Sequence, residues 1–416
     1  MVAPSESRSA YRFHAMVTMA AILAFLGAAA ILYYTMRVPS VLSWVATGSL
    51  LQKTFAHDSD CNEELRLNHI QVVGTHNSYH REISRSERDI FEKYIPDPEN
   101  VYYSHSKWTD QLDHQSVRSF EIDLHSDTEG GLYAFPLIWK FSNLTEKTAP
   151  FNNSIMKKPG LKVFHITDVD TNAICHTFVQ CLEQLKAWSE SNPGHLPLTF
   201  DIELKSDALA CGLGGVCAQE AKQWTLERIL NVDAEIRSVL SSDKLIVPDD
   251  IRRPGLTLEQ SVLQHGWPSL KDSRNKFMFY FDNDPDSPDK IRDTYRSDGS
   301  ESLQNRTVFT NGVEGDADAA FIKFNHPNVT EIQRLVKKGY FIRTRADEPI
   351  TTLLEKDTTM RDNAFKSAAH VVSTDFPAYG MSARYDSDYA VQLKGGRVAR
   401  CNPVAAPDWC EDRMVQ

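Results

Sequence analysis

Short runs of apolar and β-branched residues recur along the chain from about residue 65, and most are separated by stretches with the spacing of an amphipathic helix. Eight runs predict strands, at His69–Val73, Ser119–Leu124, Lys162–Ile166, Leu198–Leu204, Lys276–Phe281, Ala320–Phe324, Tyr340–Thr344 and His370–Thr374. Helical patterns lie between them at Phe178–Glu190, Gln219–Leu240, Thr257–His265, Val329–Lys338 and Met360–Ser367. This alternation predicts an α/β fold with a parallel sheet. Eight such strands indicate a closed (β/α)8 TIM barrel with insertions at Asp127–Gly160 and Cys211–Pro268.

The most apolar segment precedes these elements. Met16–Met36 contains 21 residues without a charge, which is long enough to cross a bilayer as a helix. Arg8 and Arg12 before it favour a cytosolic N-terminus, with the rest of the chain outside the cytosol. A cleaved signal peptide is the alternative, but signal cores usually have only about 7–15 residues. We therefore expect a cytosolic N-terminus at 1–15, a transmembrane signal anchor at 16–36, a linker at 37–64, and a barrel with a disulfide-bearing tail at 65–410.

Asparagine and cysteine positions also indicate export. Four Asn-X-Ser/Thr acceptors occur, at Asn143, Asn152, Asn305 and Asn328. Among the seven cysteines, Cys211/Cys217 and Cys401/Cys410 are spaced for small disulfide loops. If Cys175 to Cys181 is helical, the two Cα atoms are about 9 Å apart, which is too far for a disulfide. These features predict a single-pass membrane protein of the secretory pathway or cell surface, or else a secreted protein.

Composition excludes some classes of protein. Apolar residues make up 41% of the chain and charged residues 24%, which argues against a disordered chain or a multi-span membrane protein. The formal net charge of -11 would repel a phosphate backbone, so nucleic acid is not an expected partner. An acidic protein of this kind is compatible with binding a hard cation.

Polar residues concentrate where the predicted strands end, and in a barrel these ends carry the functional site. Glu121 and Asp123 are two positions apart on one strand, so both project to the same side. Two carboxylates in a barrel mouth repel each other unless a cation lies between them. With Glu203 and the amide of Asn77 they predict an oxygen-ligand site that prefers Ca²⁺ or Mg²⁺.

Two histidines end predicted strands near these carboxylates. His76 and His165 fit general acid/base catalysis on a phosphodiester, in which one takes a proton from the attacking oxygen and the other protonates the leaving oxygen. Three basic residues can hold the phosphate charge or, alternatively, form structural salt bridges: Lys205, Arg343 and Arg345. Asp282, Asp284 and Asp286 have the spacing of a calcium loop, but Ser287 replaces the required glycine, so we do not expect an EF-hand.

These strand ends resemble the Ca²⁺-dependent phosphoinositide-specific phospholipase C family of bacteria and fungi, within the barrel superfamily of phospholipase C-like phosphodiesterases. The resemblance spans roughly residues 65–410 and is carried by NHIQVVGTHNSYH (68–80), RSFEIDLHSD (118–127), KVFHITDVDT (162–171), HLPLTFDIELKSD (195–207), YFIRTRAD (340–347) and VVSTDFP (371–377). It implies catalytic roles for His76 and His165, and calcium ligation by Asn77, Glu121, Asp123 and Glu203. It also implies substrate contacts from Lys205, Arg343 and Arg345. The family's usual His-Gly-His after strand three is replaced here by His165-Ile-Thr-Asp.

The resemblance implies Ca²⁺-dependent cleavage of phosphatidylinositol-type lipids to diacylglycerol and inositol (cyclic) phosphate. The expected partner is a phospholipid at a membrane surface, and no protein partner is implied. Two alternatives stay open. One is another metal-dependent phosphodiesterase, such as a glycerophosphodiester phosphodiesterase, and the other is a non-catalytic lumenal glycoprotein that binds inositol lipids or calcium.

Overall fold

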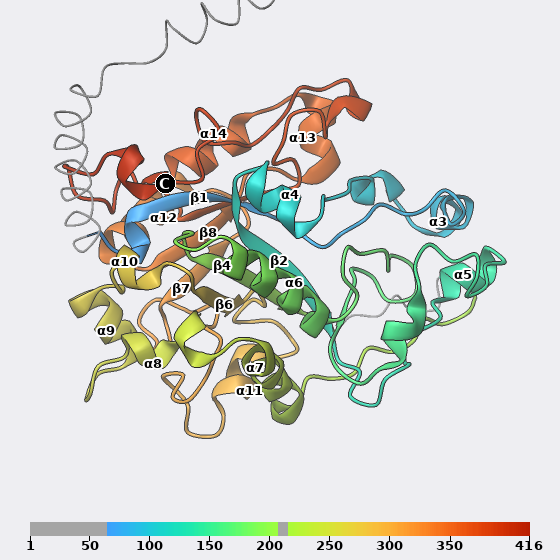
Figure 1. Cartoon of the computed structure of the whole chain (residues 1–416), viewed down its shortest axis with the longest axis horizontal. Coiled ribbons are helices and arrows are strands. Elements are labelled where there is room, and N and C mark those ends of the chain that lie inside the picture. The colour runs from blue at the N-terminus through green and yellow to red at the C-terminus, as the bar shows by residue number, and fades with distance from the viewer. Residues whose placement is uncertain (1–64, 207–214) are drawn as a thin grey trace, which may run out of the picture. The chain divides into compact units, whose positions relative to one another are not determined.

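A curled sheet of mainly parallel strands forms the centre of the fold (Figure 1), in a computed structural model that describes residues 65–206 and 215–416. Its main strands are β1 (Ile70–Thr75), β2 (Val117–His125), β4 (Leu198–Leu204), β6 (Phe277–Phe281), β7 (Phe321–Phe324), β8 (Phe341–Arg345) and β9 (Val371–Thr374). The strand order is β5-β6-β4-β2-β1-β9-β8-β7. Seven of the eight predicted strands are therefore confirmed as members of a parallel α/β sheet. The expected membrane segment at 16–36, the linker and Cys211 lie outside the described residues.

Strands β6 and β7, which do not pair with each other directly, are connected through a segment without a named strand. Tyr280 of β6 forms a parallel bridge with Phe309, and Asn311 forms another with Phe321 of β7. The amide of Phe309 also donates to the carbonyl of Phe279 at 2.8 Å. Residues 309–311 thus continue the curl of the sheet from β6 to β7.

Two strands differ from the sequence prediction. The run expected to form a third parallel strand contributes only β3 (Lys162–Val163), which pairs antiparallel with the end of β2. The prediction of a strand over Lys162–Ile166 is wrong because the chain turns after Val163, where the amides of His165 and Ile166 donate to the carbonyl of Asp170. Strand β5 (Leu245–Ile246) was not predicted, since it has only two residues. It pairs parallel with β6, so the region expected as the second insertion contributes to the sheet.

Side chains alternate across the sheet and thereby separate a packed layer from the site. Phe120, Phe200 and Phe279 lie in register on β2, β4 and β6, and their rings stack at centroid distances of 5.5 and 4.8 Å. Phe120 also packs on Trp108, at the start of α4 (Trp108–Asp113). The next residues along two of these strands, Glu121 and Asp201, point to the opposite side of the sheet. That side carries the polar site described below.

Helices surround the sheet (Figure 1). Beside α4 they are α3 (Arg88–Tyr94), α5 (Leu137–Phe141), α6 (Phe178–Ser191), α7 (Leu226–Val239), α8 (Pro248–Ile251), α9 (Leu258–His265), α10 (Leu270–Ser273), α11 (Ile291–Arg296), α12 (Val329–Lys338), α13 (Pro349–Glu355) and α14 (Thr359–Lys366). The predicted bounds of α12 are confirmed because both ends are capped. Asn328 accepts from the Glu331 amide at 3.2 Å, and Gly339 has φ 117, a left-handed conformation that glycine adopts without strain. Among the described residues, no helix has the length and apolarity needed to span a bilayer.

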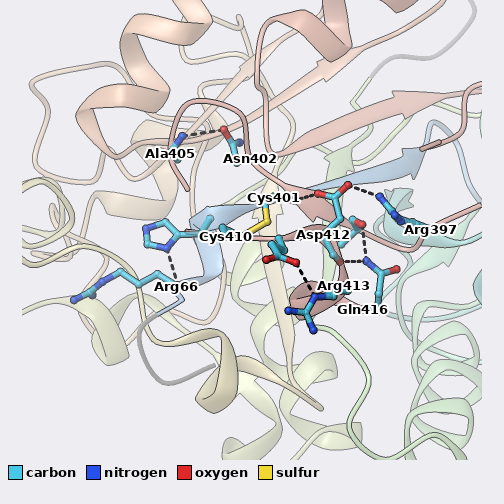
Figure 2. The surroundings of a disulfide bond; sticks show 12 residues. Arg66, Arg397, Cys401, Asn402, Ala405, Cys410, Asp412, Arg413 and Gln416 are labelled. Carbon is cyan, nitrogen blue, oxygen red and sulfur yellow. Dashed lines mark hydrogen bonds and ion pairs between the residues drawn. A yellow bond between two sulfur atoms is a disulfide. The ribbon is translucent and has the colours of Figure 1, made fainter. Parts of the chain in front are cut away.

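Two disulfides are formed within the described residues. Cys401–Cys410 is confirmed and closes the C-terminal tail (Figure 2), where Asp412 accepts from the Cys401 amide at 3.0 Å. Cys175–Cys181 also forms, with its Cα atoms 5.4 Å apart, so the expectation that these two residues cannot pair is wrong. The reason is that α6 begins only at Phe178, after its N-cap Thr177, so Cys175 lies in an extended approach and folds back onto the first helical turn.

Candidate active site

A cavity of about 600 Å³ opens at the carboxyl ends of the strands. Eight of the nine predicted site residues line it: His76, Asn77, Glu121, His165, Glu203, Lys205, Arg343 and Arg345. The ninth, Asp123, is fully buried and shares a metal-sized carboxylate cluster with Glu121 and Glu203. The structure therefore brings all nine residues to one region, although they come from five separate parts of the chain.

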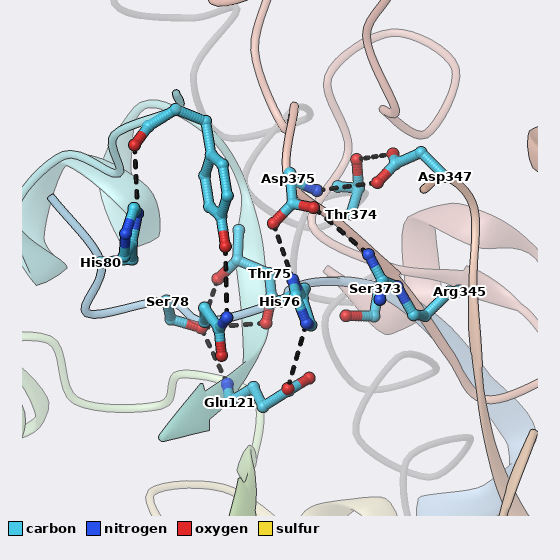
Figure 3. A network of polar contacts seen from close by, with 12 residues as sticks. Thr75, His76, Ser78, His80, Glu121, Arg345, Asp347, Ser373, Thr374 and Asp375 are labelled. Carbon is cyan, nitrogen blue, oxygen red and sulfur yellow. Dashed lines mark hydrogen bonds and ion pairs between the residues drawn. The ribbon is translucent and has the colours of Figure 1, made fainter. Parts of the chain in front are cut away.

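His76 directly follows β1 and is held at both ring nitrogens (Figure 3). Its Nδ1 donates to Asp375 at 2.9 Å, and its Nε2 lies 3.5 Å from Glu121. Asp375 is itself fixed, because its amide donates to Asp347 at 3.0 Å and its second oxygen lies 3.3 Å from Arg345. Burial, then the Arg345 charge, lowers the pKa of His76 well below 6.5, although Glu121 raises it. With Nδ1 occupied, Nε2 is the nitrogen that can exchange a proton in the cavity.

His165 lies in the turn after β3. Its Nδ1 donates to Asp170 at 2.9 Å, and its amide donates to the Asp170 carbonyl at 3.1 Å, so the side chain and backbone are fixed by the same residue. The side chain is 21% exposed, with Nε2 left for the cavity. Burial lowers the pKa of His165, and the hydrogen bond to Asp170 opposes this shift.

Glu121, Asp123 and Glu203 offer carboxylate oxygens that all lie within 4.8 Å of one another. Both oxygens of Asp123 are buried without a hydrogen-bond partner, and burial raises the pKa of Asp123 well above 3.8. Its one described countercharge is Lys205, 3.2 Å away. Three converging carboxylates with so little positive charge beside Asp123 supply the oxygen ligands that a hard cation prefers, so this set fits Ca²⁺.

Asn77 reaches the same cavity through an unusual backbone. Its φ of 42 is left-handed, a conformation that asparagine tolerates better than most residues. The amide nitrogen donates to the Tyr103 hydroxyl at 3.2 Å. The amide oxygen accepts from the Tyr79 hydroxyl at 3.4 Å and keeps a second lone pair for a ligand.

The basic residues of the site are paired with carboxylates in the structure. Arg343 is 2% exposed, donates to Glu121 and lies 3.2 Å from Asp201. Lys205 lies 2.9 Å from Glu203. Burial lowers the pKa of both basic groups, but their carboxylate partners outweigh it. Glu121 and Asp201 raise the pKa of Arg343, and Asp123 and Glu203 raise the pKa of Lys205. Lys205 and Arg343 therefore have structural ion pairs in addition to any contact with a substrate.

Several polar residues of the site were not among the predicted ones. Asp375 and Asp170 lie in the quoted segments VVSTDFP and KVFHITDVDT, and only their distances to His76 and His165 reveal their importance. Others are His80, Asp201, Asp282 and Lys323. Asp282 ends the fifth predicted strand, and Asp284 and Asp286 follow it in the rejected calcium-loop pattern; all three line the cavity. A strand-end position was the only sequence signal for most of them.

Comparisons with known proteins agree with this arrangement. The family described as phosphoinositide phospholipase C, Ca²⁺-dependent, matches residues 65–403. A calcium-dependent phosphoinositol-specific phospholipase C from Pseudomonas sp is 15% identical, with a TM-score of 0.50 over 82% of this chain and 97% of that one. A Ca²⁺-dependent phosphatidylinositol-specific phospholipase C from Streptomyces antibioticus is 17% identical, with a TM-score of 0.47 over 78% and 98%. No curated protein sequence gives a significant match. The Pseudomonas structure shares the fold.

Proposed function

This chain belongs to the Ca²⁺-dependent phosphoinositide phospholipase C family, a family of phosphodiesterases, and we propose that it cleaves phosphatidylinositol-type lipids to diacylglycerol and an inositol cyclic phosphate. One observation supports this most directly. Two histidines, each fixed through Nδ1 by a buried aspartate, line the same cavity beside a cluster of convergent carboxylates.

The two histidines have complementary tasks in the proposed reaction. His76 Nε2 takes the proton of the inositol 2-hydroxyl, whose oxygen attacks phosphorus. The bond from phosphorus to the glycerol oxygen breaks, and His165 Nε2 donates a proton to that oxygen, so neutral diacylglycerol leaves. The five-membered cyclic phosphate that remains is opened by water in the reverse sense, with His165 taking the proton of the water and His76 returning one to the 2-oxygen. Asp375 and Asp170 keep each ring in the tautomer that places Nε2 in the cavity.

The residues that would hold calcium are Asn77, Glu121, Asp123 and Glu203. When bound, the ion supplies positive charge that lowers the pKa of the attacking hydroxyl and offsets the charge of the phosphate. Arg343 positions Glu121, and Lys205 positions Glu203, through the ion pairs already described.

Electrostatics of the cavity support a head group without further phosphates on the inositol ring. Six carboxylates line the cavity, at Glu121, Glu203, Asp282, Asp284, Asp286 and Asp289, against four Lys or Arg side chains. Each of these four cations already contacts a carboxylate among the described residues. A ring phosphate would therefore meet carboxylates rather than an unused cation.

We also propose that the catalytic body is exported and works at a membrane surface. Both disulfides within the described residues suit an oxidising compartment. Asn143, Asn152, Asn305 and Asn328 are all exposed, as glycan acceptors must be. A shift in electrophoretic mobility on enzymatic removal of N-glycans tests this export, and the same mobility before and after digestion would contradict glycosylation at these sites.

Phosphorus NMR of the purified full chain tests the activity itself. The substrate is phosphatidylinositol in mixed micelles, first with Ca²⁺ and then with excess chelator. We expect a cyclic inositol phosphate signal that appears only with Ca²⁺. Release of glycerol phosphate from several glycerophosphodiesters would instead establish the alternative phosphodiesterase, and no turnover of either lipid class would contradict both.

A further inference from the structure

A third histidine lies behind the cavity wall, in the turn that follows β1. His80 is completely buried (Figure 3). Its Nδ1 lies 3.1 Å from the carbonyl oxygen of Tyr103, and its Nε2 lies 2.9 Å from Oδ2 of Asp170. A carbonyl and a carboxylate are both hydrogen-bond acceptors, so each nitrogen of His80 must carry a hydrogen. With Asp170 ionised, both contacts are satisfied when His80 is a buried imidazolium.

The same carboxylate oxygen also accepts from His165. Nδ1 of His165 lies 2.9 Å from Oδ2 of Asp170, and the two histidine rings meet edge to face at 5.8 Å. Two arrangements can hold Nε2 of His80, Nδ1 of His165 and Oδ2 of Asp170 so close together. Either protons lie between them, or the three atoms bind a metal ion, because two histidines and a carboxylate can also bind Zn²⁺. Both distances equal those of a charge-assisted hydrogen bond, which favours protons.

We propose that His80 is a positioning residue whose buried imidazolium, acting through Asp170, fixes His165 with Nδ1–H toward Asp170 and Nε2 toward the cavity. This inference rests on the proposed function, in which His165 is the proton donor to the leaving diacylglycerol. His80 does not line the cavity, and its hydrogen-bonded link to His165 runs through Asp170.

The shared carboxylate also changes how readily His165 releases its proton. A carboxylate that faces one histidine alone raises the pKa of that histidine. Here the charge of Asp170 is already balanced by His80, so the imidazolium of His165 is less stabilised and is a better acid. Asp170 raises the pKa of His80 although burial opposes this, while burial lowers the pKa of His165. The charged and titratable groups that face the two histidines are Asp170, Asp375, His76, Tyr103, His105, His125 and Lys205.

The backbone holds this arrangement together. Residues 79–81 and 172–174 are joined by two backbone hydrogen bonds: the Ile174 amide donates to the Tyr79 carbonyl at 2.8 Å, and the Arg81 amide donates to the Asn172 carbonyl at 3.1 Å. Together they form the antiparallel bridge between His80 and Ala173. The Cys175–Cys181 disulfide then ties the end of this loop to α6. The loop that carries Asp170 is thus fixed against the turn that carries His80.

Nitrogen-15 NMR of the histidine rings in the full chain tests the proton assignment without relying on activity. We expect His80 to keep both ring protons at neutral pH and His165 to carry its proton on Nδ1. A singly protonated His80 would overturn the proposal. So would one equivalent of zinc bound to protein purified without chelator, with metal-shifted signals from His80 and His165. Neither outcome would by itself contradict phospholipase activity.

The H80Q variant tests the consequence for catalysis, because glutamine can still donate to Asp170 but carries no charge. We expect the alkaline limb of the pH profile of kcat/KM, which reports the pKa of the general acid His165, to move up by about one pH unit, because Asp170 then stabilises the imidazolium of His165 alone. The matched control is H195Q. His195 is also buried, but it contacts Ser189 and the Leu196 carbonyl at the amino end of β4, so this limb should not move. An unmoved limb in folded H80Q would overturn the proposal.

Discussion

One carboxylate oxygen of Asp375 lies 2.9 Å from Nδ1 of His76, and the two residues directly follow Thr374 and Thr75, which pair in register on β9 and β1. Parallel strands place equivalent positions at the same height, so the register of the sheet itself brings this pair together. The amide of His76 donates to the Thr374 carbonyl at 3.0 Å and fixes that register at the strand ends.

This relationship predicts the effect of D375N. Asparagine has nearly the same shape, but it does not stabilise the Nδ1–H tautomer of His76 as a carboxylate does. We expect kcat on phosphatidylinositol to fall by roughly 10²–10⁴-fold, with little change in Ca²⁺ affinity. D388N, at an exposed aspartate in the segment that follows β9, is the control and should keep full activity. A folded D375N enzyme with normal kcat would show that the tautomer of His76 does not matter.

The role of His165 can be separated from that of His76 by the leaving group. A poor leaving group such as a diacylglycerol oxygen needs a proton, whereas an aryl oxygen of low pKa leaves without one. We expect H165A to lose roughly 10²–10⁴-fold on phosphatidylinositol and much less on an aryl ester of inositol phosphate. H76A should lose activity on both substrates, because the attacking hydroxyl is the same. Equal losses of H165A on the two substrates would rule out its role as the acid.

Asp123 should show opposite effects on activity and stability. Its oxygens are buried close to two other carboxylates, with Lys205 at 3.2 Å as the one described cation next to them, which is unfavourable unless a metal ion binds. We expect D123N to raise the Ca²⁺ concentration needed for turnover by at least about tenfold, since it removes a charged ligand. Without metal, the variant should unfold at the same temperature as the parent or higher.

Calorimetry with and without Ca²⁺ measures this difference. In the parent, saturating Ca²⁺ should raise the unfolding temperature. At a Ca²⁺ concentration one hundred times the dissociation constant, the free energy of unfolding should increase by about 2.7 kcal/mol. D123N should lose most of that rise. If the unfolding temperature of the parent protein is the same with Ca²⁺ and with chelator, that result would contradict a calcium site at these carboxylates.

Most of the sheet was predictable from the sequence because its strands are long enough to show a buried apolar run. Seven such runs became parallel strands, and Val329–Lys338 gave the bounds of α12 because both caps are encoded locally. The two-residue strand β5 was not predictable, since no periodicity exists at that length. For β3, the sequence did not reveal its short extent or its antiparallel pairing, which depend on the turn after Val163. The Cys175–Cys181 pairing depended on where α6 begins, a boundary that sequence patterns place only within a few residues.

The sequence predicted where the candidate site lies, but not the hydrogen bonds and ion pairs between its residues. Glu121 and Asp123 follow from strand alternation together with the polar ends of the other predicted strands, and His76 and His165 follow from their places at predicted strand ends. The ion pair of Arg343 with Glu121 joins residues 222 positions apart, and the link of His80 to Asp170 joins residues 90 positions apart. Contacts of this kind depend on the register of strands that are distant in sequence, so they require the fold.

Two exposed apolar side chains that follow the carboxyl ends of strands predict how the protein binds a lipid surface. Tyr379 and Leu354 are 74% and 63% exposed in the segments that leave the carboxyl ends of β9 and β8, the strand ends at which the cavity opens, and neither of them lines the cavity itself. We expect the double substitution Y379S/L354S to weaken binding to phosphatidylinositol vesicles by at least about tenfold, because each buried apolar side chain contributes about 1.5–3 kcal/mol. Cleavage of a monomeric short-chain substrate should be unchanged. W409S, beside the Cys401–Cys410 disulfide, is the control, and a similar loss there would contradict a docking role specific to these two side chains.

The acidic lining of the cavity predicts selectivity between inositol lipids. Lys323, the basic residue nearest the aspartates of this wall, is already paired with Asp282 at 2.7 Å and Asp284 at 3.1 Å. We expect phosphatidylinositol to be cleaved at least about tenfold faster than its 4,5-bisphosphate at equal surface concentration, since like charges placed together cost several kcal/mol. Replacing exposed carboxylates of this wall, in D284K/D286K, should narrow the ratio by supplying cations that are not yet paired. D243K/D272K makes the same charge change at two exposed aspartates outside this cavity and should leave the ratio unaltered, which separates a local contact from the effect of net charge. Faster cleavage of the bisphosphate by the parent enzyme would mean that Lys205, Arg343 or Arg345 gives up its carboxylate partner to bind a ring phosphate.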